Sequence, residues 1–173
     1  MGREAEFCEF VDAHGARLLR VAYLLTGNQV DAEDLLQDAL VTIYRRWRVV
    51  REAGNTRAYT RKVLVNQHLS QVRKKSLRIV QLRDVGIAEA TAVAGDVGDS
   101  IARADQLRSA LVALPPRQRT ALVLSFYEGL GDDEIGGLMG IRPSTVRGFI
   151  ARGLGTLRRS IVHDQETTSY EAL

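Results

Sequence analysis

Cysteine and histidine are scarce in this chain of 173 residues, which contains one cysteine, Cys8, and three scattered histidines. A lone cysteine cannot form an internal disulfide, and no group of these residues has the spacing of a metal site. The scarcity excludes a secreted disulfide scaffold and a structural zinc module. We therefore expect no metal and no other cofactor.

Long apolar runs are missing as well. The longest one near the start, Val21-Ala22-Tyr23-Leu24-Leu25, falls far short of the roughly 18 residues that a membrane span needs. The acidic N-terminus lacks the apolar core of a signal peptide. These features predict a cytoplasmic protein with no membrane insertion.

No set of residues points to catalysis. His14, His68 and His163 fall on three different segments, and no nucleophile is accompanied by a base and an orienting acid. No glycine-rich loop lies between a strand and a helix, which leaves nucleotide-binding α/β folds without support. We predict that the chain is not an enzyme and has no catalytic residue.

The net charge of +3 is small, but the charges are segregated along the chain. Residues 31–38 carry acids and no base, whereas residues 57–78 and 142–159 carry bases and no acid. Two base-only stretches within amphipathic helices favour contact with nucleic-acid phosphates over an ordinary solvated surface. The bases are Arg57, Arg61, Lys62, Arg73, Lys74, Lys75 and Arg78 in the first stretch and Arg142, Arg147, Arg152, Arg158 and Arg159 in the second.

Helical periodicity dominates residues 1–75. The pattern predicts a helix that ends at Thr26-Gly27-Asn28, a second helix that begins at Asp31 with this residue as its cap, and a third that begins at Thr56. Two apolar faces should meet in one small core. They comprise Leu35, Leu36, Ala39, Leu40, Ile43 and Trp47 on the second helix and Tyr59, Val63, Asn66, Leu69 and Val72 on the third.

The periodicity fades between Asp84 and Ser100, where glycines lie among small residues and acids, and this composition predicts a flexible linker. Helicity returns at Leu107, stops at Pro115-Pro116 and resumes as far as Gly129. The predicted fold class is all-α: two small helical domains, residues 1–80 and 104–162, joined by a linker at 81–103. The polar residues 163–173 should form a disordered tail.

Residues 132–150 have the pattern of a helix-turn-helix. Gly140 would supply the positive φ of the turn, Ile141 would fill the angle between the helices, and Ser144 would cap the second helix. A generic helical hairpin is the alternative. The core-facing positions are Ile135, Leu138, Met139, Val146 and Ile150, and the groove-facing positions are Ser144, Thr145, Arg147, Gly148, Ala151 and Arg152.

Glycines are frequent inside the predicted helices of the second domain. Each costs up to about 1 kcal/mol relative to alanine in a helix interior. The sequence therefore predicts a domain that is marginally stable alone and is completed by a partner or by DNA. The glycines concerned are Gly136, Gly137, Gly148, Gly153 and Gly155.

Three pieces of sequence together resemble the extracytoplasmic-function class of bacterial RNA polymerase sigma factors. In general sequence character they are similar to the actinobacterial members of that class. Residues 31–38, Asp-Ala-Glu-Asp-Leu-Leu-Gln-Asp, are similar to the acidic region-two helix of that family, and residues 58–66 to its minus-ten helix. Residues 114–119, Leu-Pro-Pro-Arg-Gln-Arg, with the helix-turn-helix resemble region four. Each piece alone is a weak signal, and only the combination is specific.

The resemblance implies that the acidic helix docks on the coiled coil of the largest polymerase subunit. Asp34, Gln37 and Asp38 would supply the polar contacts, beside the apolar side chains of Leu36 and Leu40. Core RNA polymerase and promoter DNA are the implied partners. An anti-sigma factor restrains many members of the family, although no residue identifies one for this chain.

The resemblance also gives the basic helix a role in promoter melting. Asn66 matches a position that lines a pocket for a base flipped from the nontemplate strand, and an asparagine can present both a donor and an acceptor to a base edge. The side chains expected to stabilise the exposed single strand are Tyr59, Arg61, Lys62, Arg73 and Lys74.

In region four, Arg147 and Arg152 match family positions that contact the minus-thirty-five element in the major groove, with Ser144 and Thr145 beside them. Gly148 stands where the family commonly has a serine, and Ala151 where it often has a larger side chain. The base preference of the family therefore does not carry over to this chain.

The leading interpretation is a dissociable promoter-specificity subunit without catalytic chemistry of its own. An alternative is a stand-alone regulator that binds DNA through the helix-turn-helix, uses the N-terminal helices for dimerisation and needs no core polymerase. A third reading is a helical adaptor or sigma antagonist that binds only protein. Such a protein would have no salt-dependent affinity for DNA.

Overall fold

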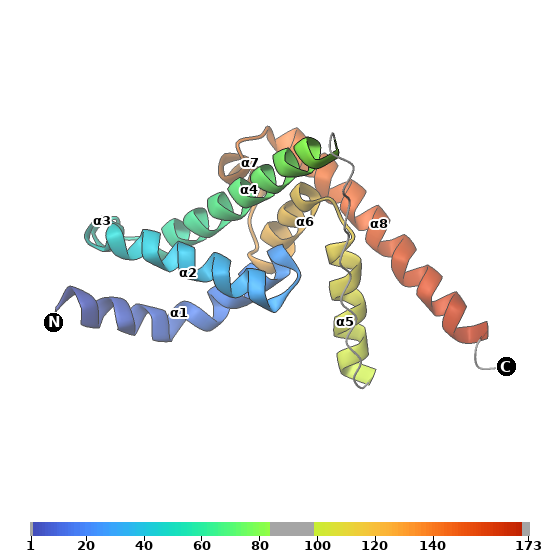
Figure 1. Ribbon diagram of the computed structural model, residues 1–173, viewed down its shortest axis with the longest axis horizontal. Helices are drawn as coiled ribbons and strands as arrows, with labels where there is room; N and C mark the ends of the chain where they lie inside the picture. The colour runs from blue at the N-terminus through green and yellow to red at the C-terminus, as the bar shows by residue number, and fades with distance from the viewer. Residues whose placement is uncertain (1, 84–98, 171–173) are drawn as a thin grey trace.

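The computed structural model describes the backbone of residues 2–83 and 99–170, and the side chains of residues 2–77 and 106–160. Every regular element in these ranges is helical, which confirms the all-α prediction (Figure 1). We call α1 to α4 the first domain and α5 to α8 the second domain. The elements are α1 (Arg3–Thr26), α2 (Gln29–Arg45), α3 (Trp47–Glu52), α4 (Thr56–Arg83), α5 (Asp99–Val112), α6 (Pro116–Leu122), the π-helix η1 (Val123–Tyr127), α7 (Asp132–Met139) and α8 (Pro143–Tyr170).

The first helix ends where the sequence predicts, but the next helix begins earlier. Gly27 has the left-handed φ of 87°, and its N–H donates to the carbonyl of Tyr23. The prediction that Asp31 caps α2 is wrong, because Asn28 Oδ1 accepts the N–H of Asp31 at 2.8 Å. Asp31 lies instead in the first helical turn. Asparagine and aspartate cap equally well, so the sequence offered two caps three residues apart.

The start of α4 shows a similar shift. Asn55 Oδ1 accepts the N–H of Ala58 at 3.0 Å, so Asn55 is the cap and the predicted cap, Thr56, is the first helical residue.

The apolar face predicted on the second helix is divided between two helices. Trp47 is buried, but it belongs to the separate short helix α3.

A single buried face on α4 is another prediction that the structure corrects. Asn66 is exposed, whereas Thr60, Leu64, Val65 and His68 are buried. The buried positions span a wide arc of the helix because α4 has neighbours on two sides. Helices α1 and α2 of the first domain and α6 and α7 of the second domain all pack against it.

Each domain contributes side chains to the core of the other. Val65 of α4 is fully buried among residues of the second domain, including Leu124, Ile135 and Val146. In return, Val123 of η1 packs in the core of the first domain. The two cores expected from the sequence are therefore joined across an apolar domain boundary.

The helix-turn-helix forms as predicted, apart from its cap. Gly140 has a φ of 66°, Ile141 packs against the second core, and Ile135 and Val146 are fully buried. However, α8 begins at Pro143, and the carbonyl of Arg142 accepts the N–H groups of Thr145 and Val146. Ser144 therefore lies in the first turn of the helix rather than at its cap.

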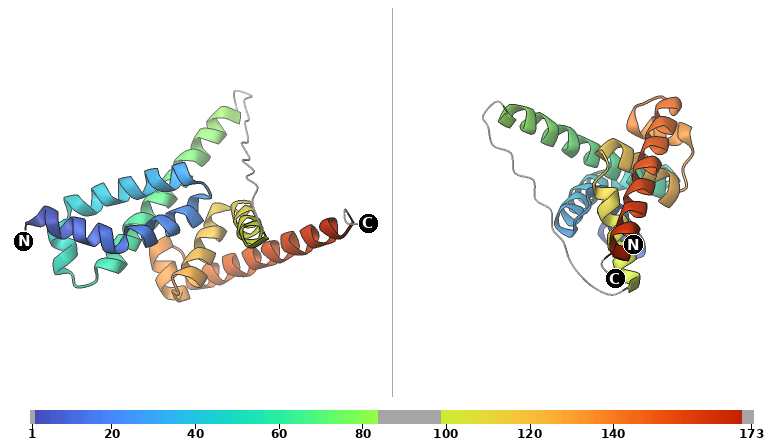
Figure 2. Two further views of the ribbon diagram at one scale, coloured as in Figure 1. Left: turned by 90° about the horizontal axis from the view of Figure 1, so that it is seen from below. Right: turned by 90° about the vertical axis from the view of Figure 1, so that its right-hand side faces the viewer.

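The last helix is longer than the sequence indicates. Its backbone is helical as far as Tyr170, where the sequence predicts a disordered tail from residue 163, and residues 171–173 lie outside the described range. The end of α8 lies at the opposite end of the molecule from the start of α1 (Figure 2). Of the predicted linker, residues 81–83 end α4 and residues 99–103 begin α5, while residues 84–98 lie outside the described range.

Two of the helical glycines allow close contacts that a larger residue would block. A Cβ at Gly136 would lie 2.7 Å from the carbonyl oxygen of Ile141, and one at Gly153 would lie 2.6 Å from Cδ1 of Leu122. Gly137 and Gly155 have open space around them. The glycines therefore do not only lower the stability of the second domain. Gly136 permits its tight turn, and Gly153 permits its helix packing.

Gly136→Ala and Gly137→Ala form a matched pair that tests this distinction. We expect Gly136→Ala to lower the free energy of unfolding by about 1–3 kcal/mol, because backbone must move to admit the methyl group. We expect Gly137→Ala to raise it by up to about 1 kcal/mol. Urea unfolding followed by circular dichroism measures both. Equal effects of the two substitutions would contradict the backbone contact at Gly136.

Candidate nucleic-acid interface

The acidic helix α2 presents its predicted partner-binding residues together. Asp34, Gln37 and Asp38 are exposed, and Leu36 and Leu40 beside them are half-buried. The sequence analysis missed Val41, whose side chain is 51% exposed. Its position three residues after Asp38 continues the same face, and that spacing is the signal that could have identified it.

Three of the predicted DNA-binding residues lie on one outward face of α4. Lys62, Asn66 and Arg73 are all exposed, at intervals of four and seven residues that bring them onto one side of a helix. Tyr59 is near this face but packs partly against the first core. The face offers two cations and one amide to an approaching polyanion.

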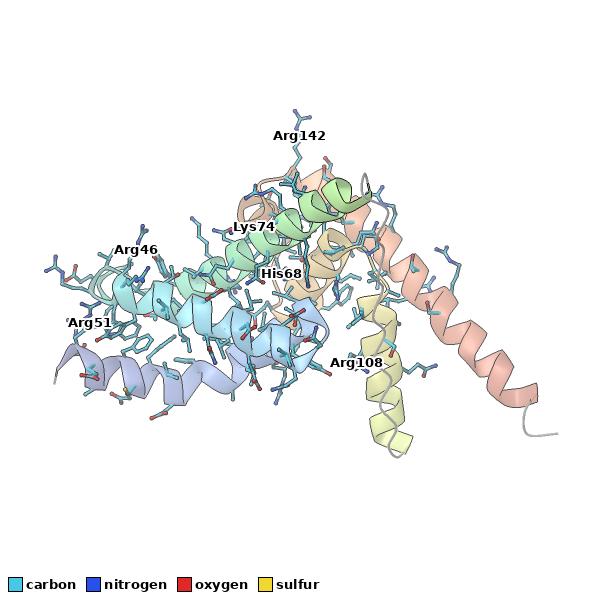
Figure 3. All side chains as sticks on the ribbon, in the orientation of Figure 1. Arg46, Arg51, His68, Lys74, Arg108 and Arg142 are labelled. Atoms are coloured by element: carbon cyan, nitrogen blue, oxygen red, sulfur yellow. The ribbon has the colours of Figure 1, made fainter. Side chains whose placement is uncertain are left out.

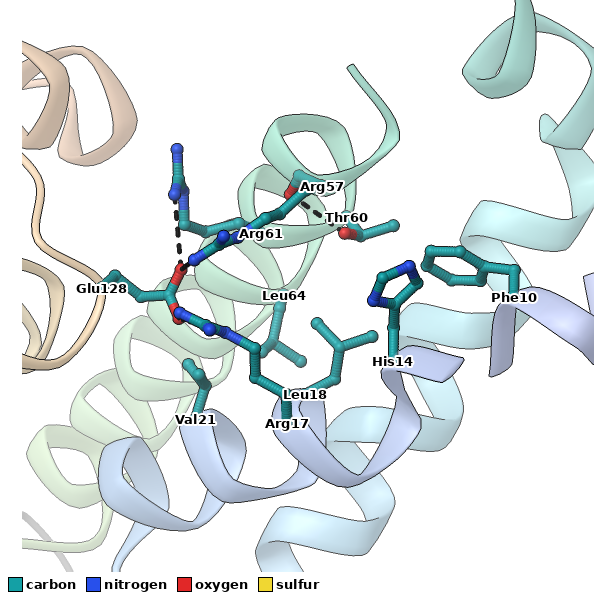
Figure 4. Close-up of a pocket in the computed structure, with 10 residues that line it drawn as sticks. All are labelled: Phe10, His14, Arg17, Leu18, Val21, Arg57, Thr60, Arg61, Leu64 and Glu128. Carbon is teal, nitrogen blue, oxygen red and sulfur yellow. Dashed lines mark hydrogen bonds and ion pairs between the residues drawn. The ribbon is translucent and has the colours of Figure 1, made fainter. Parts of the chain in front are cut away.

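Arg61 lies on a different side of α4 and is already engaged by the second domain. Its side chain is 15% exposed, and its guanidinium lies 3.3 Å from the carboxylate of Glu128. The side chain of Glu128 is 4% exposed and also pairs with Arg17 at 2.9 Å and Arg57 at 3.8 Å. Figure 4 shows the carboxylate pointing between these three arginines, beside a pocket of about 220 Å³.

Arg17 and Glu128 were not among the residues predicted from the sequence. Glu128 is separated along the chain from Arg61 by 67 residues and from Arg17 by 111 residues, so no local pattern connects them. Three guanidinium groups around one carboxylate leave two positive charges without a partner in this cluster. Such a cluster can exchange its carboxylate for a phosphate group, which guanidinium binds by the same geometry.

The remaining predicted residue of α4, Lys74, is exposed beside a cleft between the two domains (Figure 3). His68, one turn and a half earlier on the same helix, is buried at that cleft. Burial, followed by the nearby charges of Arg119 and Lys75, lowers the pKa of His68 from 6.5 to about 4. His68 is therefore neutral at physiological pH, and its Nε2 atom has no hydrogen-bond partner among the described residues.

On α8 the predicted groove-facing residues are mostly open to solvent. Ser144, Arg147 and Arg152 are exposed, and Thr145 is half-buried. Arg147 donates to Asp132 of α7 at 3.2 Å, and the guanidinium of Arg152 lies over the ring of Phe149. DNA would have to replace the pairing of Arg147 with Asp132. Arg142, in the turn before this helix, points away from the fold (Figure 3).

Within residues 2–83 and 99–170, no helix is long and apolar enough to cross a membrane. The same part of the chain holds no group of three or more histidine, cysteine, aspartate or glutamate residues that could bind a metal ion.

Both domains match known families. The family model "Sigma-70 region 2" matches residues 10–78, and "Sigma-70, region 4" matches residues 104–157. The chain is 34% identical over 165 residues to the RNA polymerase sigma-E factor of Streptomyces coelicolor, covering 94% of this chain and 89% of that protein. It is 37% identical over 164 residues to the ECF RNA polymerase sigma factor SigE of Mycolicibacterium smegmatis, covering 92% of this chain and 63% of that protein.

Solved structures share the fold. The chain matches the sigma factor RpoE, solved in complex with the anti-sigma factor NepR from Bartonella quintana, with a TM-score of 0.71 and 24% identity, covering 90% of this chain and 96% of that one. It matches CnrH, solved in complex with the cytosolic domain of CnrY, with a TM-score of 0.61 and 20% identity, covering 93% and 90%.

Glu128→Gln tests how far the arginine cluster holds the domains together. We expect it to lower the free energy of unfolding by about 1–3 kcal/mol, because the amide leaves the half-buried Arg61 without a counter-charge. Energy transfer should also fall between a dye on the exposed Cys8 and one on a second cysteine introduced by Arg158→Cys. Glu52→Gln is the matched control, since Glu52 lies on the surface, where it pairs with the exposed Arg48 at 3.9 Å. Unchanged transfer in Glu128→Gln would mean that the cluster does not restrain the domains.

The buried His68 predicts a loss of stability in mild acid. Its pKa is about 4 in the folded chain and 6.5 in the unfolded one, so the unfolded chain binds more protons as the pH falls through this window. Its contribution is fully present above pH 6.5 and should fall by about 2 kcal/mol between pH 7.5 and pH 5. Urea unfolding at the two pH values should show this extra loss in the wild type but not in His68→Gln. The same loss in both proteins would assign the effect to other groups.

Proposed function

Because this chain belongs to the extracytoplasmic-function group of RNA polymerase sigma factors, we propose that it directs core RNA polymerase in the cytoplasm to a set of promoters. The first domain would bind the minus-ten element and the second domain the minus-thirty-five element. The observation that carries this proposal is the presence, in one chain, of an exposed basic face on α4 and a helix-turn-helix with open groove-facing residues. The sigma factor itself contributes recognition and melting and no catalytic step.

The outward face of α4 supports a role in melting. We assign Asn66 to a flipped base, since its amide is exposed and can donate and accept, and Lys62 and Arg73 to the phosphates of the displaced strand. Arg61 and Lys74 would join them once the second domain no longer engages or adjoins them. Tyr59 would stack on a base only through the part of its ring outside the core.

The first turns of α8 support a role in duplex recognition. We assign Arg147 and Arg152 to base edges or phosphates in the major groove and Ser144 and Thr145 to contacts beside them. The exposed stripe of Asp34, Gln37 and Asp38 with Leu36 and Leu40 is assigned to core polymerase. Charged groups beside an apolar strip are what docking one helix on another requires.

The two domains have to separate for both promoter elements to be bound together. The elements lie about 25 base pairs apart, which is roughly 85 Å of duplex at 3.4 Å per pair. In the structure α4 packs directly against α7 of the second domain. We therefore take this arrangement for the state of the free sigma factor, in which Glu128 occupies arginines of the promoter-binding domain.

Run-off transcription tests the proposal. With Streptomyces core polymerase and a library of actinobacterial promoters, the wild type should produce discrete new start sites. Asn66→Ala and Arg147→Ala should each reduce these transcripts about tenfold or more, since each removes a base contact worth 1–3 kcal/mol. Arg48→Ala, which changes a side chain on α3 that is 82% exposed, is the control.

The alternatives predict different results from the same experiment. DNA binding that is tight and specific without core polymerase, and no core-dependent transcript, would favour the stand-alone regulator. The absence of both transcription and salt-dependent DNA binding would favour the protein-binding adaptor. Full activity of both alanine variants would contradict the assigned contacts.

A further inference from the structure

A cleft of about 590 Å³ lies between the two domains, away from the arginine cluster around Glu128. Helices α1, α2 and α4 of the first domain form most of its wall, and α6 of the second domain closes it through Pro116 and Arg119. Leu25, Val72 and Pro116 make part of the lining apolar. The volume falls within the range of about 300–1,000 Å³ that is usual for small-molecule sites.

Arg119 stands in this wall without a counter-charge. The residue is 7% exposed, and its Nε and Nη1 atoms have no hydrogen-bond partner among the described residues. Within the same part of the chain, no carboxylate lies close enough to form an ion pair with it. Buried guanidinium groups are normally paired, because burial removes the water that stabilises their charge. This burial also lowers the pKa of Arg119.

The neighbouring groups do not neutralise this charge. Asp31 and Asp34 both line the cleft, but Asp31 is bound by Asn28 at 2.9 Å and by Lys75 at 3.4 Å, and the side chain of Asp34 is exposed to solvent. The last turn of α1 adds only a partial negative charge. On the positive side, Lys74 lies at the rim.

A small anion would resolve this imbalance better than water. Water satisfies N–H groups but leaves the charge of the guanidinium uncompensated, whereas an anion does both. We propose that the cleft binds a small phosphorylated ligand of up to nucleotide size, with its phosphate held by Arg119 and Lys74 and any ring against Leu25, Val72 and Pro116. A phosphate fits a site that offers several N–H donors from arginine and lysine.

Binding would also act on the domains themselves. Because both domains form the cleft, the ligand binds only while they are packed together, and mass action then stabilises that state. This consequence rests on the proposed function, since it opposes the separation that promoter binding needs. The binding itself does not rest on it and can be measured on the free chain without polymerase.

The test is titration calorimetry and thermal unfolding of the full chain with inorganic phosphate, adenosine monophosphate or citrate, each compared with chloride at equal ionic strength. We expect saturable binding of a phosphorylated probe and a rise in Tm. Arg119→Met should weaken binding about tenfold or more by removing the charge at similar volume. Arg117→Gln, an exposed position on the same helix, should leave binding within about twofold. If Arg119→Met does not fold, Lys74→Gln at the rim supplies the comparison, and we expect it to weaken binding severalfold.

The probes separate the sources of the phosphate. Tighter binding of adenosine monophosphate than of inorganic phosphate would identify a nucleotide-like ligand, and equal binding would identify free phosphate. Three results would overturn the proposal: no saturable binding, equal binding of citrate, or binding that is unchanged in both Arg119→Met and Lys74→Gln. Run-off transcription without added ligand reports on the sigma function separately, so the two failures are distinguishable.

Discussion

Val65 of α4 is fully buried, yet it packs among side chains of the second domain, while Leu64 next to it packs in the first. One helix therefore serves two cores, and this arrangement limits what the rest of α4 can do. The sides of the helix that face the two domains are occupied. The outward face with Lys62, Asn66 and Arg73 is packed against neither domain and is left for a partner. The position of the candidate DNA-binding site follows from where the apolar residues lie.

Apolar packing and ion pairing contribute differently to the contact between the domains. Burying a valine side chain contributes about 1.5–3 kcal/mol, and Val65 and Val123 each cross the boundary. The arginines around Glu128 are less decisive, because Arg17 and Arg57 are 45% and 56% exposed and such pairs contribute little. Packing therefore makes the larger contribution, and the pair of Glu128 with Arg61, whose side chain is 15% exposed, adds to it and keeps that cation occupied. A phosphate backbone can therefore take the place of Glu128 at the arginines, while separation of the domains also removes Val65 and Val123 from the cores that they join.

Local sequence chemistry predicted the elements well and their ends less well. The turn at Gly140 was predictable because a glycine that can adopt positive φ, the isoleucine that fills the angle between the helices and the buried neighbours all lie within residues 135–146. The caps of α2 and α4 were misplaced because two capping residues competed at each start, and backbone geometry decided for Asn28 and Asn55. The single face assigned to α4 was wrong because periodicity assumes one buried side. The pairing of Glu128 with Arg17 and Arg61 left no trace in the sequence, since contacts so distant along the chain come only from the packing of the domains.

Some interactions stabilise the arrangement in which the two domains are packed together, and others destabilise it. The apolar boundary stabilises it, whereas Arg119, which is buried and has no ion-pair partner among the described residues, opposes it. Below pH 6.5 the lowered pKa of His68 adds to that opposition. Because these contributions oppose one another, the free-energy difference between the packed and separated arrangements is smaller than the apolar boundary alone would give. A partner shifts such an equilibrium only by as much as it binds one state better than the other. The uncompensated charge of Arg119 therefore lowers the preference for the separated domains that polymerase and promoter have to supply.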